Sequence, residues 1–358
     1  MADINRYQRQ MILPTFGLAS QEKLLAAKVL IVGVGGLGCP VLQYLVGAGI
    51  GTIGIMDADS ISLSNLHRQL LFTESEIGLL KVDQAAAKMQ ALNSDVLINK
   101  YPFNLERSNA LSIIAAYDLV VDATDNFPAK YLINDACLVL NKPFVFGAVS
   151  RYEGQVTVFN MSVGDKERIN YRDLFPEPPK QGEVPSCAEA GVLGALPGII
   201  GAMQAAEAIK LISGIGEPLI GRLFHYDLLQ ARGIEIAISK NRDSITINEQ
   251  MFSENNYDDL EEELDIPEIS VKEFNEMRSS PNVFVLDVRE LNEYPPIDFS
   301  NAQIPMSELP SKMHEIPEKE ICIICHQGIR SVYAAQQISK KRNLKVYSLK
   351  GGLTAFFK

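Results

Sequence analysis

Residues 28–38, Lys28-Val-Leu-Ile-Val-Gly33-Val-Gly-Gly-Leu-Gly38, decide the fold of the first half of the chain. An apolar run ends at Val32, a turn of the form G-x-G-x-x-G follows, and residues 36–49 have the composition of a helix. Glycines in such a turn let backbone N–H groups approach phosphate at the start of a helix. The stretch therefore predicts a nucleotide-binding α/β domain, without saying which nucleotide it binds.

Strand and helix signals alternate beyond this turn. We predict strands at residues 28–32, 52–56, 118–121 and 143–146, and helices at residues 36–49, 81–92 and 128–140. This alternation is typical of a doubly wound, mostly parallel sheet of the Rossmann-like kind. Later segments are predicted to be antiparallel strands, at residues 155–159, 222–226 and 234–239, and a mobile proline-rich loop, at residues 175–182.

The distribution of charge divides the chain. The net charge is −11, and eight acidic residues with no basic residue lie between positions 249 and 265. A stretch this acidic favours a solvated linker over a binding surface. We therefore predict a first domain at residues 1–248, a linker at 249–265 and a small α/β domain at 266–358. The elements expected in the small domain are strands at 283–286, 321–324 and 345–349 and a helix at 331–341.

Composition argues against several classes of protein. The N-terminus is polar, and the apolar residues 190–212 contain Pro197, Glu207 and Lys210, so we expect neither a signal peptide nor a membrane span. Five cysteines are too few for a disulfide framework, which favours a reducing cytoplasm. The sequence has no block of basic residues that would bind nucleic acid.

A second signature lies near the C-terminus, where Cys325-His-Gln-Gly-Ile-Arg330 follows an apolar run. If a helix begins at Ser331, successive backbone N–H groups point at the sulfur and favour its thiolate or persulfide form. Arg330 either adds positive charge to this loop or ties the loop to its surroundings. Cys322 and Cys325 also form a C-x-x-C pattern, but three positions along a strand put two side chains on opposite faces, which disfavours a redox pair.

Further motifs indicate which nucleotide enzyme this is. Asp57 stands nineteen positions after Gly38, where both nicotinamide and ATP enzymes bind a ribose. The distinguishing motifs are Asp57-Ala-Asp59-Ser-Ile-Ser-Leu-Ser-Asn65-Leu-His-Arg68-Gln69, Arg6-Tyr-Gln-Arg9-Gln10, Lys81 after Gly78, and Ala123-Thr-Asp125-Asn126. Together they make residues 1–240 resemble the ubiquitin-activating-type enzymes, and in particular the bacterial adenylyltransferases that activate sulfur-carrier proteins for molybdopterin and thiamin synthesis.

That resemblance implies ATP and Mg²⁺ as cofactors. By analogy Arg68 and Lys81 neutralise the phosphates, Asp57 binds the ribose and Asp125 holds Mg²⁺. Arg9 would reach into the site of a neighbouring subunit, which implies a homodimer. The residues expected to line the nucleotide are Gly33, Gly35, Gly36, Gly38, Asp57, Asp59, Asn65, Arg68, Lys81, Asp125 and Asn126.

The resemblance also makes predictions about Cys187 and about a zinc site formed by cysteines. Cys187, in Pro185-Ser-Cys-Ala-Glu-Ala-Gly191, matches a family cysteine that attacks the acyl-adenylate or takes part in sulfur transfer, and a structural role stays open. Relatives often carry two C-x-x-C pairs that bind a structural zinc. This chain has Asn170-Tyr-Arg-Asp173 at the first pair and no cysteine at residues 244–247, so we predict that it binds no zinc. We expect Cys39 and Cys137 to be core residues.

The cysteine loop resembles the active loop of rhodanese-type sulfurtransferases. Four residues separate Cys325 from Arg330, whereas related phosphatases have five, and the smaller loop suits sulfur. Matching segments are Asp287-Val-Arg289-Glu-Leu-Asn-Glu293-Tyr294, Ile304-Pro305 and Lys350-Gly-Gly-Leu-Thr-Ala-Phe356. Residues 295–302 lack the usual His-Ile-Pro-Gly. By this resemblance Cys325 and Arg330 are the catalytic residues.

The two halves predict one pathway. The first would adenylate the C-terminal glycine of a small ubiquitin-like sulfur carrier ending in Gly-Gly, and Cys325 would deliver persulfide sulfur from a donor such as a cysteine desulfurase. The carrier would leave as a thiocarboxylate. An activator of a ubiquitin-like modifier for conjugation, with an accessory rhodanese module, is the main alternative. Arg68, Lys81 and Asp125 argue against a nicotinamide oxidoreductase and against a binding scaffold with a dead site. The sequence does not distinguish molybdopterin, thiamin, tRNA thiolation and cysteine pathways.

Overall fold

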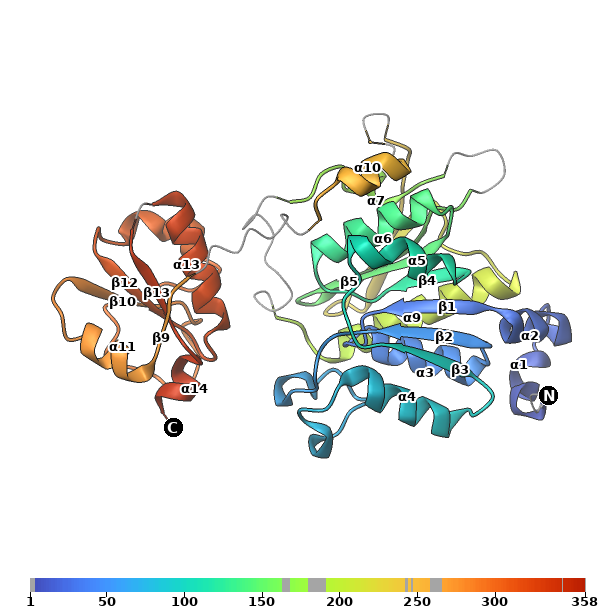
Figure 1. The fold of residues 1–358 in the computed structure, drawn as a ribbon, viewed down its shortest axis with the longest axis horizontal. Helices are drawn as coiled ribbons and strands as arrows, with labels where there is room; N and C mark the ends of the chain where they lie inside the picture. Colours follow the sequence, from blue (N-terminus) through green and yellow to red (C-terminus); the bar gives the residue numbers. More distant parts are fainter. Residues whose placement is uncertain are drawn as a thin grey trace. The chain divides into compact units, whose positions relative to one another are not determined.

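The computed structural model forms two compact units, residues 1–260 and 261–358, each with its own sheet (Figure 1). It describes residues 4–162, 168–179, 191–241, 244–245, 247–257, 266–342 and 344–357. The predicted loop at residues 175–182 lies outside these ranges beyond residue 179.

The first sheet has eight strands in the order β3-β2-β1-β4-β5-β6-β7-β8 (Figure 1). They are β1 Lys28–Val32, β2 Thr52–Met56, β3 Leu97–Tyr101, β4 Leu119–Asp122, β5 Phe144–Ser150, β6 Glu153–Phe159, β7 Arg222–Asp227 and β8 Arg232–Ala237. Strands β1 to β5 run parallel, and β6 to β8 continue antiparallel from β5. The predicted doubly wound sheet is confirmed. The prediction missed β3, a half-exposed edge strand that mixes polar and apolar residues.

Helices cover both faces of this sheet (Figure 1). Along β1, Val29 and Ile31 point into one apolar core while Leu30 and Val32 point into the other, as the alternation of a strand requires. The first core is closed by α3 Gly38–Ala48, α4 Lys81–Leu92 and α9 Ala195–Ser213, and the second by α5 Arg107–Ala115 and α6 Phe127–Val139. Other helices of this unit are α1 Gln8–Met11, α2 Gly17–Ala26 and α7 Tyr171–Leu174.

Among the described residues, α9 is the one helix long and apolar enough to cross a membrane. It instead packs on α3, β5 and β6 inside the first unit. A Cβ at Gly201 would lie 2.4 Å from the Leu37 carbonyl oxygen, so the glycine lets α9 approach α3 closely. The Glu207 carboxylate, 5% exposed, accepts a hydrogen bond of 2.8 Å from the Leu219 N–H. The helix is therefore a core helix, as the sequence predicts.

The predicted linker begins too early. Residues Glu249–Glu254 form α10, which packs on α6. Phe252 and Tyr257 are buried, and the Tyr257 hydroxyl donates a 2.8 Å hydrogen bond to the Asp135 carboxylate. Apolar residues thus hold this acidic segment to the first unit, which the count of charges did not indicate. Residues 258–265 lie outside the described ranges.

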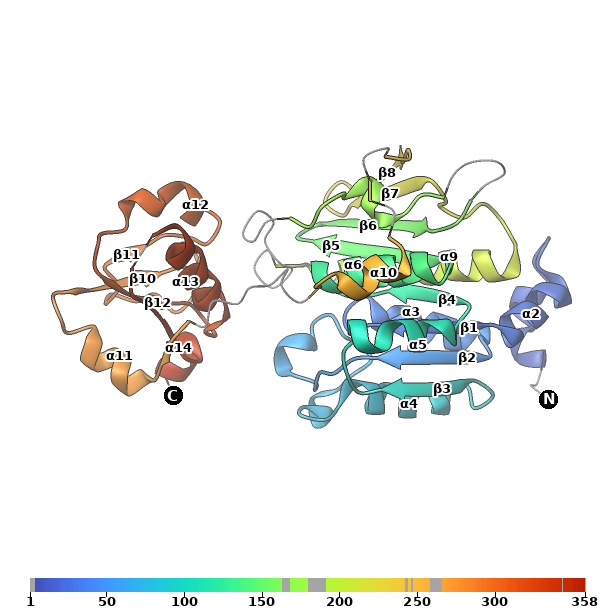
Figure 2. The ribbon, with the colours of Figure 1, turned by 45° about the horizontal axis from the view of Figure 1, so that its top comes forward.

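The second unit has a five-stranded parallel sheet in the order β11-β10-β12-β13-β9 (Figure 2). Its strands are β9 Glu268–Ile269, β10 Val283–Asp287, β11 Ala302–Gln303, β12 Glu320–Ile324 and β13 Val346–Leu349. Its helices are α11 Val271–Met277, α12 Leu309–Lys312, α13 Ile329–Lys341 and α14 Gly352–Phe356. Separate apolar cores fill the two faces of the sheet.

Candidate active sites

The nucleotide-type turn lies where the strand order of the first sheet reverses. After β1 the chain adds β2 and β3 on one side, and then β4 and β5 on the other. Ligands of open α/β sheets bind at the carboxyl ends of the strands beside such a switch point. The turn leaves β1 at this end, and the residues that follow β2 and β4 lie at the same edge.

Close backbone contacts explain two of the glycines in this turn. Gly33 has a φ of +93°, and a Cβ there would lie 2.6 Å from the Ala123 carbonyl oxygen. A Cβ at Gly38 would lie 1.9 Å from the Gly33 carbonyl oxygen. A side chain at Gly33 would push the turn away from the segment after β4, and one at Gly38 would distort the turn itself. The structure therefore places Gly33 next to Ala123 and Thr124, the residues that follow β4.

Asp57, Asp59 and Lys81 form a charged cluster after β2. The Asp57 carboxylate accepts hydrogen bonds from Val34 N–H of the turn, at 2.8 Å, and from Asp59 N–H, at 2.9 Å. Burial raises the pKa of Asp57, and the Lys81 ammonium, 3.8 Å away, opposes this shift. Lys81 is 4% exposed and its Nζ lies 2.6 Å from an oxygen of Asp59. A buried ammonium thus lies beside the glycine turn at the start of α4.

Arg68 lies against the turn on its other side. Its Cδ is 3.5 Å from the position that a Cβ of Gly36 would occupy, and its guanidinium donates a 2.9 Å hydrogen bond to the Ser64 carbonyl. Asn65 ends a short 3₁₀ turn, where its side chain accepts a hydrogen bond from Ser62 N–H at 3.3 Å. Asn65 therefore caps its own 3₁₀ turn. Arg68 is the charged residue of this segment that lies next to the glycine turn.

Asp125 and Asn126 follow β4. The Asn126 side chain caps α6 by accepting a 2.9 Å hydrogen bond from Ala129 N–H, and Asp125 is exposed. The loop that carries them is fixed by the buried Lys130, whose Nζ donates to the Asp122 carboxylate at 2.9 Å and to the Thr124 carbonyl at 3.0 Å. Sequence reasoning missed Asp122 and Lys130. The available signal was a carboxylate at the end of an apolar strand and a cation eight residues later in the next helix.

One predicted site residue, Arg9, is not brought to this site. It is exposed in α1, two residues after Tyr7, whose ring abuts Gly49 at the far end of α3 from the turn. Figure 1 accordingly shows α1 and α2 at the opposite edge of the sheet from the loops that follow β2 and β4. Cys187 lies outside the described residues.

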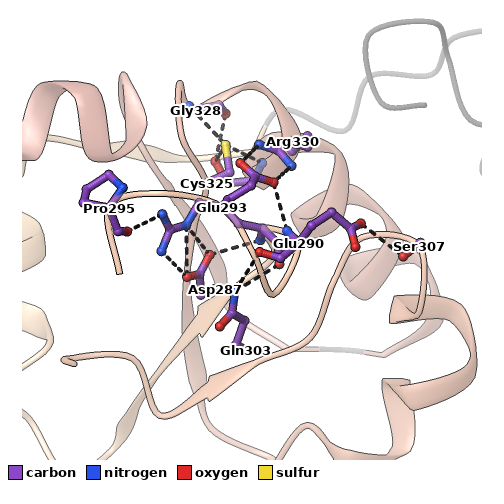
Figure 3. Close-up of polar contacts among 11 residues, drawn as sticks. Asp287, Glu290, Glu293, Pro295, Gln303, Ser307, Cys325, Gly328 and Arg330 are labelled. Carbon is purple, nitrogen blue, oxygen red and sulfur yellow. Dashed lines mark hydrogen bonds and ion pairs between the residues drawn. The ribbon is translucent and has the colours of Figure 1, made fainter. Parts of the chain in front are cut away.

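The second site surrounds Cys325, which follows β12 and is 1% exposed (Figure 3). Its Sγ accepts hydrogen bonds from Gly328 N–H at 3.1 Å and from Ser331 N–H at 3.4 Å. Gly328 has a φ of +91°, and a Cβ there would lie 2.8 Å from the Gly351 nitrogen. The predicted inward N–H groups are present, although α13 begins at Ile329 instead of Ser331.

Arg330 ties the loop to the segment after β10. Its guanidinium forms a two-point ion pair with Glu293, with Nη2 2.7 Å from Oε2 (Figure 3). Burial favours a higher pKa for Glu293, but hydrogen bonds from Arg330 and from Glu290 N–H lower it overall. Arg330 in turn has a raised pKa, mainly through its hydrogen bond to Glu293. The sequence leaves open whether Arg330 adds positive charge to the loop or ties the loop to its surroundings, and the structure shows the second of these roles.

Arg289 fixes the segment of residues 287–295, which carries Glu293. Its guanidinium, 1% exposed, pairs with the buried Asp287 at 2.8 Å and donates a 2.8 Å hydrogen bond to the Pro295 carbonyl (Figure 3). Residues 287–295 are thereby fixed at the carboxyl end of β10, beside the cysteine loop. The sequence motif does not indicate a role for Glu293, and the structure shows that it holds Arg330 of the cysteine loop.

The remaining described cysteines are buried. Cys322 packs in the core on one face of the second sheet while Cys325 belongs to the core on the other face, as predicted from their spacing. Burial raises the pKa of Cys322 to about 12 and that of Cys39 to about 12, and it also raises that of Cys137. Cys39 and Cys137 are core residues of the first unit, also as predicted.

A polar cluster surrounds Asp173, in the segment where the sequence resemblance raises the question of a zinc site. The Asp173 carboxylate accepts hydrogen bonds from Asn170 N–H at 2.8 Å, Lys240 Nζ at 3.1 Å, Ser244 Oγ at 3.0 Å and Asn241 N–H at 3.2 Å. These contacts join the two segments that a zinc ion would link. The absence of zinc itself stays a prediction.

Comparison with known proteins agrees with both halves. The ThiF family model matches residues 7–246 and the rhodanese-like domain model matches residues 270–358. The sulfur carrier protein adenylyltransferase of Thermus thermophilus is 51% identical over 240 residues, which cover 67% of this chain and 89% of that protein. The probable adenylyltransferase/sulfurtransferase MoeZ of Mycobacterium tuberculosis is 38% identical, covering 99% of this chain and 93% of that protein.

Two further comparisons extend this result. The adenylyltransferase and sulfurtransferase MOCS3 of Arabidopsis thaliana is 38% identical over 99% of this chain and 83% of its own length. A crystal structure of Escherichia coli MccB matches with a TM-score of 0.59 at 22% identity, over 69% of this chain and 75% of that chain, and supports the fold alone.

Fold, sites and full-length relatives together define a two-domain enzyme, an adenylyltransferase joined to a sulfurtransferase. The chain belongs to the ThiF family, and its second unit is a rhodanese-like domain. The resemblance drawn from the sequence motifs is confirmed.

Proposed function

We propose that this enzyme adenylates the C-terminal glycine of a small ubiquitin-like sulfur carrier and then converts it into a thiocarboxylate with sulfur from Cys325. One observation carries the proposal. Three charged side chains, Asp57, Arg68 and Lys81, contact or closely adjoin one glycine turn, in a chain that also buries a cysteine among inward N–H groups. The name of the Thermus thermophilus relative supports a sulfur carrier as the substrate.

In the adenylation step, a carboxylate oxygen of the carrier attacks the α-phosphorus of ATP and pyrophosphate leaves. Such a step needs positioning and neutralisation of charge more than covalent help. The N–H groups of the glycine turn would hold phosphate, and Arg68 and Lys81 would offset its charge. The Lys81 ammonium is held by Asp59 at 2.6 Å, and it would exchange this exposed carboxylate for phosphate oxygens. Asp57 would accept a hydrogen bond from the ribose.

The residues present fit a magnesium ion bound together with the nucleotide. Among the described residues, no group of three or more His, Cys, Asp or Glu side chains could enclose a metal. Mg²⁺ does not need such a group, because it binds through one or two carboxylates together with substrate phosphates and water. Asp125, exposed at the carboxyl end of β4, supplies a carboxylate of that kind. Bound there, the ion would neutralise charge on the pyrophosphate leaving group.

In the sulfur step, the Cys325 thiolate would take the outer sulfur of a donor persulfide, and the donor thiolate would leave. The outer sulfur of the Cys325 persulfide would attack the acyl carbon of the carrier adenylate, which releases AMP and forms an acyl disulfide. A second thiol, from Cys187 or a small reductant, would attack the Cys325 sulfur. The carrier would then leave as a thiocarboxylate and a disulfide would remain on Cys325 for reduction.

The decisive test replaces Cys325 by serine in the full chain. The variant should keep carrier-dependent ATP–pyrophosphate exchange and lose both thiosulfate–cyanide sulfurtransferase activity and thiocarboxylate formation, measured by the mass of the carrier. Cys187→Ser is the comparison variant, and it should slow transfer while leaving sulfurtransferase activity unchanged. If Cys325→Ser still makes thiocarboxylate at the wild-type rate, the second unit is not the source of sulfur.

A further inference from the structure

Two serine hydroxyls from different elements lie behind the Cys325 sulfur. Ser331 is in the first turn of α13 and Ser348 is in β13, and both are 0% exposed. The Ser331 Oγ is 3.4 Å from the Cys325 Sγ and 2.8 Å from the Gly328 carbonyl oxygen. The Ser348 Oγ is 2.8 Å from the Ser331 Oγ and 3.4 Å from the same carbonyl.

These distances raise the question of which acceptor receives the proton of the Ser331 hydroxyl. A serine hydroxyl has one proton, so Ser331 can donate to the Gly328 carbonyl or to the Cys325 sulfur, but not to both at once. When Cys325 is a thiol, the shorter contact to the carbonyl is the better one. When Cys325 is a thiolate or a persulfide, its negative sulfur is the stronger acceptor.

Turning the Ser331 proton to the sulfur leaves the Gly328 carbonyl in need of a donor. Val332 N–H reaches this carbonyl at 3.4 Å, which is a weak contact. A buried acceptor with poor partners is destabilising, and the Ser348 hydroxyl, whose Oγ is also 3.4 Å from the Gly328 carbonyl oxygen, can turn toward it and add a second donor. Both hydroxyls then change direction together, so that the Gly328 carbonyl and the charged sulfur each have a hydroxyl donor.

We propose that Ser348 is a positioning residue that releases the Ser331 hydroxyl to stabilise the charged sulfur of Cys325. The proposal rests on the proposed role of Cys325 and adds to it a residue from β13. Ser348 does not touch the sulfur. It acts by replacing Ser331 at the Gly328 carbonyl, so its effect depends on the presence of the Ser331 hydroxyl.

The described hydrogen bonds of the Ser348 side chain go to Gly328 and Ser331 alone, and none goes to a charged group around the loop. Arg330 in α13 pairs with Glu293 from the segment after β10, and Glu290 of that segment accepts a hydrogen bond from Ser307. His326 adjoins Cys325 in the loop, and Lys350 after β13 is exposed. A change at Ser348 that shifts the pH profile of Cys325 is therefore attributable to the hydroxyl pair.

The test compares Ser348→Thr with Ser348→Val in the full chain. The two side chains have the same shape and differ in the hydroxyl, so packing strain affects both alike. We would measure the rate of Cys325 alkylation by iodoacetamide across pH by peptide mass spectrometry, with the peptide that contains the buried Cys137 as the internal control. Relative to Ser348→Thr, the midpoint of the Ser348→Val profile should rise by roughly half to one pH unit, the size expected for one lost hydrogen bond. A common midpoint in the two variants would refute the proposal.

A double-mutant comparison separates the relay from two independent effects. In a Ser331→Ala background, Ser348→Val should shift the profile no further than Ser348→Thr does, because no hydroxyl remains to be released. Additive shifts would contradict the relay. The role of Cys325 is checked separately by Cys325→Ser. Retained sulfurtransferase activity there would refute the proposed function whatever the Ser348 variants show.

Discussion

Glu293 holds Arg330 by two parallel contacts, from Nη1 to Oε1 and from Nη2 to Oε2, the latter at 2.7 Å. The arginine of the cysteine loop is thus paired with a carboxylate of the protein itself. That carboxylate belongs to the segment after β10, the strand next to β12 in the sheet. Its primary effect is to fix the start of α13, and with it the N–H groups that face the sulfur.

We expect Glu293→Gln to loosen this loop. Sulfurtransferase activity should fall several-fold, while carrier-dependent pyrophosphate exchange stays normal because that site lies in the other unit. Both partners are partly exposed, so the pair contributes about 1 kcal/mol or less to stability. Glu308→Gln, which removes a comparable exposed pair with Lys312, is the control and should leave both activities unchanged.

The same pair predicts a pH dependence. The pKa of Glu293 is lowered in the folded protein, so its contribution is present above the ordinary range of a glutamate and is lost as pH falls through the lower, folded value. The difference in melting temperature between wild type and Glu293→Gln should therefore be constant from neutral pH down to the ordinary range of a glutamate pKa, and it should decrease as the pH falls below that range. A difference that grows on acidification would show that another group dominates.

Asp125→Ala should abolish adenylation without harming the fold. The side chain is exposed at the carboxyl end of β4, so we expect carrier-dependent ATP–pyrophosphate exchange to fall by about 100-fold or more, as loss of the carboxylate that holds the phosphate-neutralising Mg²⁺ predicts. The melting temperature should stay close to that of wild type. Asp83→Asn, at a half-exposed pair with Lys100, is the matched control. Normal ATP–pyrophosphate exchange in Asp125→Ala would refute the proposed role of Asp125 in holding Mg²⁺.

Arg9 offers a test of the proposed homodimer. Because it lies away from the site of its own chain, Arg9→Ala and Asp125→Ala should each be inactive alone and complement when mixed and allowed to exchange subunits. Each mixed dimer would hold one intact site, so the mixture should recover about a quarter of wild-type exchange activity. If no activity returns although subunit exchange is demonstrated, Arg9 does not act across an interface.

Asp173 should join residues 170–173 to residues 240–244 without a metal ion. Asp173→Asn removes the charge that gathers Lys240, Ser244 and two backbone N–H groups, and it should destabilise the first unit by about 2 kcal/mol or more. Asp95→Asn, at an exposed position, should have little effect. A metal chelator should leave the wild-type melting temperature unchanged. One zinc per chain in protein purified without added metal would overturn this prediction.

Sequence reasoning found the parts of the fold whose signals are local. The glycine at 38 is required by a contact with Gly33 within the turn itself, and the N–H groups around Cys325 come from the loop and helix that follow it. Patterns of this kind can be seen before the structure is known, because the residues that interact are neighbours in the sequence.

What the sequence did not indicate depends on contacts between distant segments. The role of Glu293 depends on an arginine thirty-seven residues later, and Ser348 meets Ser331 only because β13 lies beside β12. The boundary of the first unit was misplaced for a similar reason. Charge indicated a linker at 249, whereas Phe252 and Tyr257 find apolar partners on α6 that composition does not reveal.

The opposite orientations of Cys322 and Cys325 have a consequence for oxidants. A sulfenic acid on Cys325 could be rescued by a neighbouring thiol through an internal disulfide, but Cys322 faces the other core of the sheet. Among the four described cysteines, the other two are buried in the first unit. Within the described part of the chain, Cys325 therefore has no protective partner. In a Cys187→Ser variant, peroxide in the absence of added thiol should carry it on to the irreversible sulfinic state.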